Sequence, residues 1–353
     1  MTYAKKQKLK PRILSILLLS LFILVLMTGC DVVNSITGQD EDQNKSSIHP
    51  ILLNGSWGFM NNSGSIILEP TFDLARDVSD GMAAVREETL WGYVHVDSVR
   101  NTIIPQFASA GDFEDGLAPV QLPGQPYGFI DYSGNFAIEA KFDFAQPLSE
   151  DKAAVRIDGL WGYINADGSV LVEPTYSDAR PFSDGLAAVE TFDGWNYIDE
   201  NGEERINPTF QISSAGEFVD GLATIETADG WGFINKSGNP VITPKYQEVG
   251  RFSQGLAWFR DGDYIGFINK DEEIVIEAQF AEVKPFSEDM AAVRLRNDWF
   301  YIKKSSGLIS ITTPFENAES FTNGIARVQL GNDEDVRYGY INKKGEYIWY
   351  PTK

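Results

Sequence analysis

Short apolar stretches alternate with polar turns along most of this 353-residue chain. The segment KAAVRIDGLWGYIN, residues 152–165, contains two such β-prone stretches around a turn with glycine. In WGYINADGSVLVEP, residues 161–174, two further stretches flank Asp167 and Gly168, residue types that supply the positive φ angles of tight hairpins. No long 3.6-residue periodicity follows the first 30 residues, so the pattern predicts strands and hairpins and not helices.

The same unit recurs nine times along the chain. Alignment on Gly162 gives nine positions spaced 34 to 39 residues apart, at 58, 92, 128, 162, 196, 232, 266, 300 and 339. A second block, of the type Leu-Ala-Ala-Val at 186–189, recurs eight times with the same period. A period of this length indicates a tandem repeat, here of three-stranded antiparallel meanders.

Each meander is too small to be stable alone, so it must bury one face against its neighbours. Nine such units fit either an open, superhelical, solenoid-like array or a closed, propeller-like ring. Propeller blades usually have four strands and about 40 residues or more, and a ring of nine blades is unusual. We therefore expect an all-β fold with an open array over residues 48–353, and keep the closed ring as the alternative.

The tryptophan and glycine of each unit are predicted to be packing positions. A Trp ring removes roughly 150–250 Å² from water, and a feature present in most units is explained more simply by the fold than by nine binding sites. Phe300 occupies one glycine position, and phenylalanine is costly at positive φ, so we expect close packing to select glycine there. The structural positions are Trp57, Gly58, Trp91, Gly92, Trp161, Gly162, Trp195, Trp231, Gly232 and Trp299.

Two tryptophans, Trp258 and Trp349, lie outside this column. We expect them to be core residues, with an exposed platform for stacking on sugars as the alternative.

The spaced blocks as a whole closely resemble the WG-repeat (KWG) family of bacterial proteins, from about residue 48 to the end of the chain. The resemblance implies an all-β repeat scaffold that is often extracytoplasmic, and it implies no shared activity.

The first 30 residues follow a different pattern. MTYAKKQKLKPR is basic, and the apolar run ILSILLLSLFILVLMTG leads directly to Cys30, the one cysteine of the chain. LVLMTGC resembles the lipobox of bacterial lipoproteins, whose cysteine carries a lipid; an uncleaved membrane anchor is the alternative. The resemblance implies a signal peptide over residues 1–29, a lipidated Cys30 and an acidic tether over residues 30–47, on the extracytoplasmic face of the cell membrane.

Charge and composition exclude several functions. The formal net charge is -22, and such an acidic surface repels nucleic acid. One cysteine and two histidines, His49 and His95, are too few for a zinc site or a Ser-His-Asp arrangement. We therefore expect no nucleic-acid partner, no metal and no cofactor.

The position after the Ala-Ala-Val block varies between units and gives the candidate binding stripe, which consists of Arg86, Arg156, Arg260 and Arg294. Four arginines in one column would suit an anionic polymer or a carboxylate-bearing partner. The alternative is an ordinary solvated strand edge. The 51 acidic residues allow the paired carboxylates of a glycoside hydrolase, but the sequence brings no particular pair together.

These observations favour a cell-envelope lipoprotein whose repeat domain is a non-enzymatic binding or adaptor module. The partner would be a protein or a cell-wall polysaccharide, and the N-terminal lipid would provide the membrane contact. A structural envelope lipoprotein without a dedicated ligand is the alternative, and a hydrolase is less favoured.

Overall fold

The computed structural model describes residues 48–95, 102–206, 210–331 and 335–352. The chain divides into two compact units, residues 1–47 and 48–353, and every described residue lies in the second. Within the described residues, 34 strands form nine antiparallel sheets, each made of strands consecutive in sequence. We number these sheets as blades 1 to 9 in chain order.

The first five blades extend from residue 48 to residue 206. Blade 1 comprises β1 (Ile48–Leu53), β2 (Ser56–Asn61) and β3 (Ile66–Phe72). Blade 2 comprises β4 (Leu74–Ala75), β5 (Met82–Glu87), β6 (Leu90–His95) and β7 (Ile103–Phe107). Blade 3 comprises β8 (Ser109–Ala110), β9 (Ala118–Gln121), β10 (Tyr127–Ile130) and β11 (Phe136–Phe142). Blade 4 comprises β12 (Phe144–Ala145), β13 (Lys152–Ile157), β14 (Leu160–Asn165) and β15 (Val170–Tyr176), and blade 5 comprises β16 (Asp178–Ala179), β17 (Leu186–Thr191), β18 (Gly194–Asp199) and β19 (Glu204–Ile206).

The last four blades extend from residue 214 to residue 352. Blade 6 comprises β20 (Ser214–Val219), β21 (Leu222–Thr227), β22 (Gly230–Asn235) and β23 (Pro240–Tyr246). Blade 7 comprises β24 (Leu256–Asp261), β25 (Tyr264–Asn269) and β26 (Ile274–Phe280). Blade 8 comprises β27 (Glu282–Val283), β28 (Met290–Leu295), β29 (Asp298–Lys303) and β30 (Ile309–Phe315), and blade 9 comprises β31 (Asn317–Ala318), β32 (Ile325–Leu330), β33 (Arg337–Asn342) and β34 (Tyr347–Thr352).

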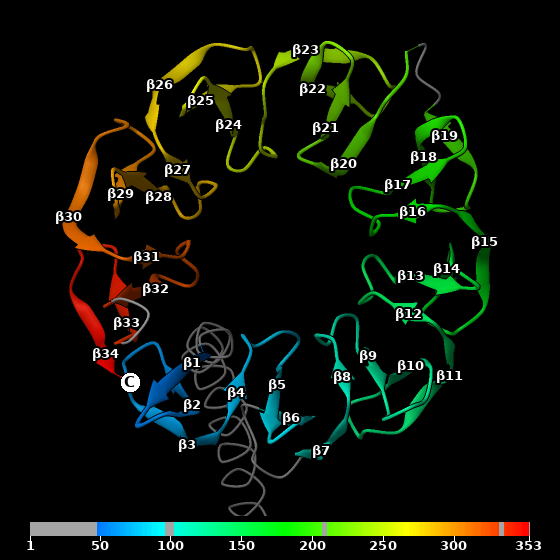
Figure 1. Cartoon of the computed structure of the whole chain (residues 1–353), viewed down its shortest axis with the longest axis horizontal. Helices are drawn as coiled ribbons and strands as arrows, with labels where there is room; N and C mark the ends of the chain where they lie inside the picture. The colour runs from blue at the N-terminus through cyan, green and yellow to red at the C-terminus, as the bar shows by residue number, and fades with distance from the viewer. Residues whose placement is uncertain (1–47, 96–101, 207–209, 332–334, 353) are drawn as a thin grey trace, which may run out of the picture. The chain divides into compact units, whose positions relative to one another are not determined.

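The blades succeed one another around a ring (Figure 1). Short strands such as β12 and β31 lie toward the centre of the ring, and long strands such as β15 and β30 form its outer side. Where blade 9 meets blade 1, Ile51 and Met60 pack in one buried cluster with Ile325 and Tyr340. The repeat domain is therefore a nine-bladed β-propeller.

The expected open array is wrong, and the closed ring is what the chain forms. An open array would leave the first and last blades with exposed end faces, whereas Ile51 and Met60 are 1% and 0% exposed in the contact between these two blades. The three-stranded meanders are present as predicted, but most blades add a fourth strand. That strand is only two residues long in blade 5, Asp178–Ala179, so 34 to 36 residues suffice for a blade.

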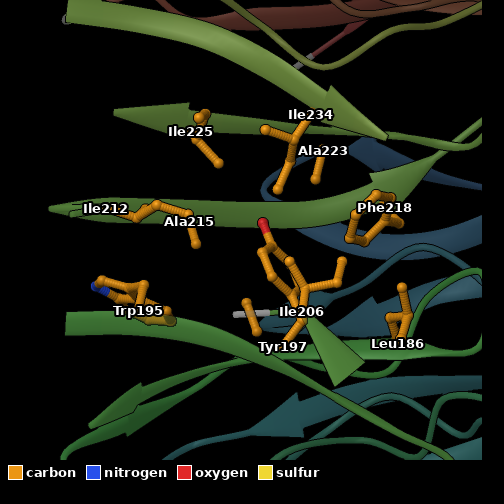
Figure 2. Close-up of a cluster of buried hydrophobic side chains, with 11 residues drawn as sticks. Leu186, Trp195, Tyr197, Ile206, Ile212, Ala215, Phe218, Ala223, Ile225 and Ile234 are labelled. Carbon is orange, nitrogen blue, oxygen red and sulfur yellow. The ribbon is translucent and has the colours of Figure 1, made fainter. Parts of the chain in front are cut away.

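Each pair of neighbouring blades shares a hydrophobic core. Figure 2 shows the cluster between blades 5 and 6, in which Trp195 and Tyr197 point toward the strand that carries Ala215 and Phe218. All four side chains are at most 5% exposed. Burial of this kind stabilises each blade against the next, which explains why the sequence repeats its aromatic positions with the period of the blades.

A second inter-blade contact links the turns that precede the Ala-Ala-Val strand. In blade 5 this turn has Asp184 at φ 57° and Gly185 at φ 78°. The Asp184 carboxylate accepts a hydrogen bond from the backbone N–H of Gly221 in blade 6 at 2.8 Å. Equivalent bonds join Gly116 to Asp80, Asp151 to Asp115, Gly185 to Glu150, Asp289 to Gln254 and Gly324 to Glu288. The acidic residues of these turns are thus partly explained as acceptors within the ring.

Three sequence interpretations concern residues outside this description. The predicted signal peptide, Cys30 and the tether over residues 30–47 all precede Ile48 and lie outside the described residues. In the described part of the chain, no helix has the length and apolarity that a bilayer crossing requires.

Candidate binding face

The glycines of the repeat stand where two strands approach each other closely. A Cβ atom at Gly162 would lie 2.4 Å from the carbonyl oxygen of Val172 and 2.7 Å from the nitrogen of Pro174. The pairing of β14 with β15 shifts register at this point, between Trp161 and Tyr163. Added Cβ atoms at Gly58, Gly92 and Gly232 would meet the outer strand at 2.5, 2.3 and 2.5 Å. None of these four glycines has a positive φ, so close approach and not backbone angle selects glycine.

The tryptophans of the column lie in the cores between blades. Trp161, Trp195 and Trp299 are buried. Trp57, Trp91 and Trp231 are half-buried and pack against the same type of cluster. The two tryptophans outside the column are also packed: Trp258 lies against the cluster around Phe267, and Trp349 lies against the cluster around Tyr340.

Tyrosines next to the glycine column are hydrogen-bond donors between blades. The Tyr163 hydroxyl donates to the carbonyl oxygen of Arg180 in the following blade at 2.7 Å. Tyr93, Tyr197 and Tyr301 make the same contact with Gly111, Gly216 and Glu319. Burial raises the pKa of Tyr163, so its hydroxyl stays protonated and remains a donor.

The arginine column lies between the inner strands and the tryptophans. Arg156 pairs across the sheet with Phe144 on one side and with Trp161 on the other. Arg86 and Arg294 have the same two neighbours, which are Leu74 and Trp91 for Arg86 and Glu282 and Trp299 for Arg294. The repeat therefore brings the predicted column to the same end of every blade.

Two of the four arginines stack on aromatic rings. The Arg156 guanidinium lies 5.8 Å from the ring centre of Phe144 and 5.7 Å from that of Trp161. The Arg86 guanidinium lies 5.6 Å from the ring centre of Trp91. Among the described residues, neither Arg86 nor Arg156 forms an ion pair with a carboxylate, so both guanidinium charges are held only by aromatic faces.

The other two arginines are neutralised within their own blades. Arg260 Nε lies 2.9 Å from the Glu248 carboxylate, and Arg294 pairs closely with Glu282. The remaining members of the column are Gln121, Glu190, Glu226 and Gln329. The predicted stripe is therefore not continuous: uncompensated positive charge is confined to blades 2 and 4.

Three further cations, which the sequence interpretation missed, lie beside the tryptophans: Lys284 lies 5.8 Å from the ring centre of Trp299, and the other two are arginines. Arg76 lies 4.5 Å from the ring centre of Trp91, and Arg180 lies 5.1 Å from that of Trp195. Each follows the alanine of an inner strand, so the available signal was the sequence Ala-Arg after that short strand. We call Arg76, Arg86, Trp91, Arg156, Trp161, Arg180 and Trp195 the cation–aromatic face.

Open depressions occur between neighbouring blades. One of about 380 Å³ is lined by Arg180, Trp231 and Arg251, among others, and therefore borders the cation–aromatic face. Another of about 240 Å³ lies at the contact of blades 9, 1 and 2. Within the described residues, no cluster of His, Cys, Asp and Glu has the arrangement of a metal site.

The same repeat defines a known family. The family model described as the WG containing repeat matches residues 57–91, 91–124, 127–161, 161–194, 195–229, 231–264, 265–299 and 299–332. The chain belongs to the WG-repeat family. Every match begins at the tryptophan column, in the middle of a blade, so the WG-repeat unit of sequence spans parts of two successive blades.

One solved structure supports the fold of this WG-repeat protein. It is similar to the crystal structure of the eukaryotic initiation factor, with a TM-score of 0.63 and 12% identity over 87% of this chain and 98% of that chain. The computationally designed Ika8 protein gives a TM-score of 0.47 at 10% identity, over 78% and 94% of the two chains. Dihydro-heme d1 dehydrogenase NirN gives 0.48 at 12% identity, over 79% and 75%. Among curated proteins, none matches this chain.

Proposed function

We propose that this chain is a lipid-anchored, extracytoplasmic binding module without enzymatic activity, and that its cation–aromatic face binds a carboxylate-bearing protein partner. The observation that carries the proposal is the pair Arg86 and Arg156, two guanidinium groups held on aromatic rings with no carboxylate partner among the described residues. The two arginines occupy equivalent positions of blades 2 and 4, each paired across the sheet with a tryptophan of the repeat column.

The chemistry of these positions suits a carboxylate. A guanidinium offers several N–H donors in one plane and binds a carboxylate through two parallel hydrogen bonds. Stacking on Trp91 or Trp161 restricts the arginine side chain, which lowers the entropy lost on binding. A partner with acidic groups spaced to match blades 2 and 4 would engage both arginines at once, and avidity would follow from that spacing.

The membrane attachment rests on the sequence. Cys30 follows a basic segment and an apolar run, as a lipobox cysteine does, and lies 18 residues before Ile48, the first described residue. Replacement by Cys30→Ser is expected to move the protein from the membrane fraction to the soluble fraction without changing its thermal stability. A Cys30→Ser chain that remains in the membrane fraction would contradict the lipid anchor.

The binding proposal is tested with the full chain as bait in envelope extract, in parallel with purified cell-wall polysaccharide. The test variant is Arg86→Gln with Arg156→Gln, because glutamine occupies the same column at Gln121 and Gln329 and the fold accepts it there. The matched control is Arg260→Gln, whose arginine is already paired with Glu248.

We expect one acidic protein to be retained by the wild type and by Arg260→Gln, and to be lost with the double variant. Equal retention by all three proteins would refute binding through Arg86 and Arg156. Retention of polysaccharide in place of a protein would indicate that the ligand of the same face is an acidic glycan. No retention in either arm would favour a structural envelope lipoprotein.

A further inference from the structure

A cation lies over the repeat tryptophan in three blades. In blade 5 the Arg180 guanidinium lies 5.1 Å from the ring centre of Trp195. The equivalent pairs in blades 2 and 8, at 4.5 and 5.8 Å, are Arg76 with Trp91 and Lys284 with Trp299. All three cations directly follow the short inner strand of their blade. The repeat thus provides one position from which a positive charge reaches a tryptophan face.

Blade 6 has no side chain at this position. Gly216 of blade 6 is the equivalent of Arg180 of blade 5. Two residues earlier, Ser214 and Asp178 each pair across the sheet with a glutamate, which fixes this register. Within the described part of the chain, no cation lies over Trp231, the tryptophan of this blade. Gly216 and Trp231 both lie within the described residues 210–331, so the difference comes from the sequence itself.

The space above Trp231 stays open. Blade 7 also has a glycine at this position, but there the opposite strand carries Trp258, and a Cβ atom at Gly250 would lie 1.9 Å from its indole nitrogen. The opposite residue in blade 6 is Thr224, a much smaller side chain. A depression of about 380 Å³ lies here, and its lining includes Ser214, Gly216, Thr224 and Trp231. We call it the Trp231 depression.

A carboxylate next to this tryptophan has no cation of its own. Glu226 pairs across the sheet with Trp231. It accepts a hydrogen bond from the Ser213 hydroxyl at 3.4 Å and forms no ion pair with any described residue. In blade 5, Glu190 pairs with Trp195 in the same way, and there an arginine lies on the tryptophan. Blade 6 therefore has the tryptophan and the glutamate of this arrangement without the cation.

The two arginines in the wall of the depression are compensated by carboxylates. Arg180 Nη2 lies 3.4 Å from the Asp178 carboxylate. Arg251 Nη1 lies 3.8 Å from the Glu217 carboxylate. The charge of these two groups is thus offset within the wall, and a cation that enters the depression meets little net repulsion from them.

We propose that the Trp231 depression binds an alkylguanidinium group, which is the chemistry of an arginine side chain. The planar cation lies on the indole ring as Arg180 does in blade 5. Its N–H groups donate to the Ser214 hydroxyl, and the Glu226 carboxylate supplies the opposite charge. The site takes the charge opposite to that of the ligand in the proposed function, and it goes beyond that function.

The experiment follows the indole N–H resonance of Trp231 in the full chain with isotope-labelled tryptophan, during titration with N-acetyl-arginine amide. The variant Trp231→Phe identifies the resonance. The matched control ligand is N-acetyl-citrulline amide, which has nearly the same shape and no charge. Agmatine is titrated in parallel, because a free amine carries the same guanidinium group as an arginine of a protein.

The test variant is Gly216→Arg with Thr224→Ala, which gives blade 6 a cation of its own. It recreates the pair of Arg180 and Ala188 in blade 5, whose backbones are hydrogen-bonded at 2.9 Å. Thr224→Ala alone is the reference, because it makes the same change on the opposite strand and leaves Gly216 in place. Arg180→Gly is an independent variant, which opens the equivalent space over Trp195.

We expect saturable binding of N-acetyl-arginine amide to the wild type and binding at least about tenfold weaker to the double variant. Thr224→Ala alone is expected to change the affinity by less than about threefold. The citrulline amide is expected to leave the Trp231 resonance unmoved. In Arg180→Gly, the Trp195 resonance is expected to respond to the arginine amide as well.

Equal binding by the wild type and the double variant, or equal responses to the arginine and citrulline amides, would overturn the inference. A Trp231 resonance that responds to neither the arginine amide nor agmatine would do the same. Tighter binding of the arginine amide than of agmatine would assign the group to a protein, and the reverse would assign it to a free amine. The proposed function is tested separately through Arg86 and Arg156, which none of these variants changes.

Discussion

Tyr340 in blade 9 donates a hydrogen bond to the carbonyl oxygen of Pro50 in blade 1 at 2.6 Å, across 290 residues of sequence. The same tyrosine position donates to an inner-strand carbonyl at other junctions, as Tyr301 does to Glu319. The junction of the first and last blades thus keeps the donor of the repeat and changes the acceptor, which here is a carbonyl oxygen of β1. The two ends of the repeat array are matched to each other.

The first prediction concerns this junction. The change Tyr340→Phe removes the donor and leaves a buried carbonyl oxygen of Pro50 without it, so we expect the free energy of unfolding to fall by about 1–3 kcal/mol. Amide hydrogen exchange is expected to rise in β1, β2 and β33. The control Tyr301→Phe is expected to lower stability without faster exchange in β1, and faster exchange there in the control would contradict a specific role of Tyr340 in closure.

The second prediction concerns His49, which packs on Tyr340 and donates from Nε2 to the Asn62 side-chain oxygen at 2.8 Å. Burial lowers the pKa of His49 below its ordinary value of 6.5, although Asn62 and Asp77 act in the opposite direction. The unfolded chain therefore binds more protons than the folded chain below about pH 6.5, so the free energy of unfolding falls as the pH is lowered through this range.

Denaturant unfolding at about pH 7.5 and about pH 5.5 measures this effect. We expect His49→Phe to reduce the loss of stability between the two pH values, because phenylalanine packs on Tyr340 without titrating. The control is His95→Gln at the second histidine of the chain. A pH dependence that is unchanged in His49→Phe would show that His49 does not control the acid sensitivity of the junction.

The sequence predicted the repeat and its strands because both are set by local patterning. A turn followed by an apolar strand, such as Asp158 and Gly159 before Trp161, recurs along the chain with variable residues, and β13 and β14 form a hairpin at this turn. Closure was not predicted, since it depends on the angle between successive blades. No short pattern encodes that angle, and the decisive contacts, such as Asn62 to the carbonyl oxygen of Asn323, join positions 261 residues apart.

The candidate site was predicted in position but not in charge. The column of Arg86 and Arg156 could be identified because it follows the Ala-Ala-Val block in each unit. The neutralisation of Arg260 could not be predicted, because Glu248 is 12 residues away in sequence. Glu248 becomes a neighbour of Arg260 only through the short inner segment. That segment has too few residues to show a strand periodicity. The sequence therefore did not indicate which carboxylates it brings to the arginine column.

The third prediction tests why glycine occupies the repeat column. Gly162→Ala would place a Cβ atom 2.4 Å from the Val172 carbonyl oxygen, so β14 and β15 must separate. We expect a loss of about 1–3 kcal/mol in the free energy of unfolding. The matched control is Asn196→Ala, because blade 5 already accommodates a side chain at this position of the column. We expect this control to change the free energy of unfolding by less than about 1 kcal/mol. Similar losses in both variants would contradict selection by close approach.

The last prediction comes from a pair of cross-strand neighbours. In blade 7 the N–H of Gly250 donates to the carbonyl oxygen of Trp258, and a Cβ atom at Gly250 would lie 1.9 Å from the Trp258 indole nitrogen. The equivalent pair in blade 4 is Gln146 and Ala154, with the large residue on the opposite strand. In these two pairs one member is small where the other is bulky, which indicates a volume shared by the two side chains in blades 4 and 7.

A double-mutant cycle measures this exchange. Gly250→Gln alone is expected to cost about 1–3 kcal/mol through overpacking, and Trp258→Ala alone about 2–4 kcal/mol through the cavity it leaves. The double variant recreates the pair of blade 4, so its loss is expected to be smaller than the sum by at least about 1 kcal/mol. Gly250→Gln combined with Trp91→Ala, in distant blade 2, should be additive within about 0.5 kcal/mol. Additivity in the Gly250 and Trp258 pair itself would refute a shared volume, and would leave the glycine of blade 7 to be explained by its backbone alone.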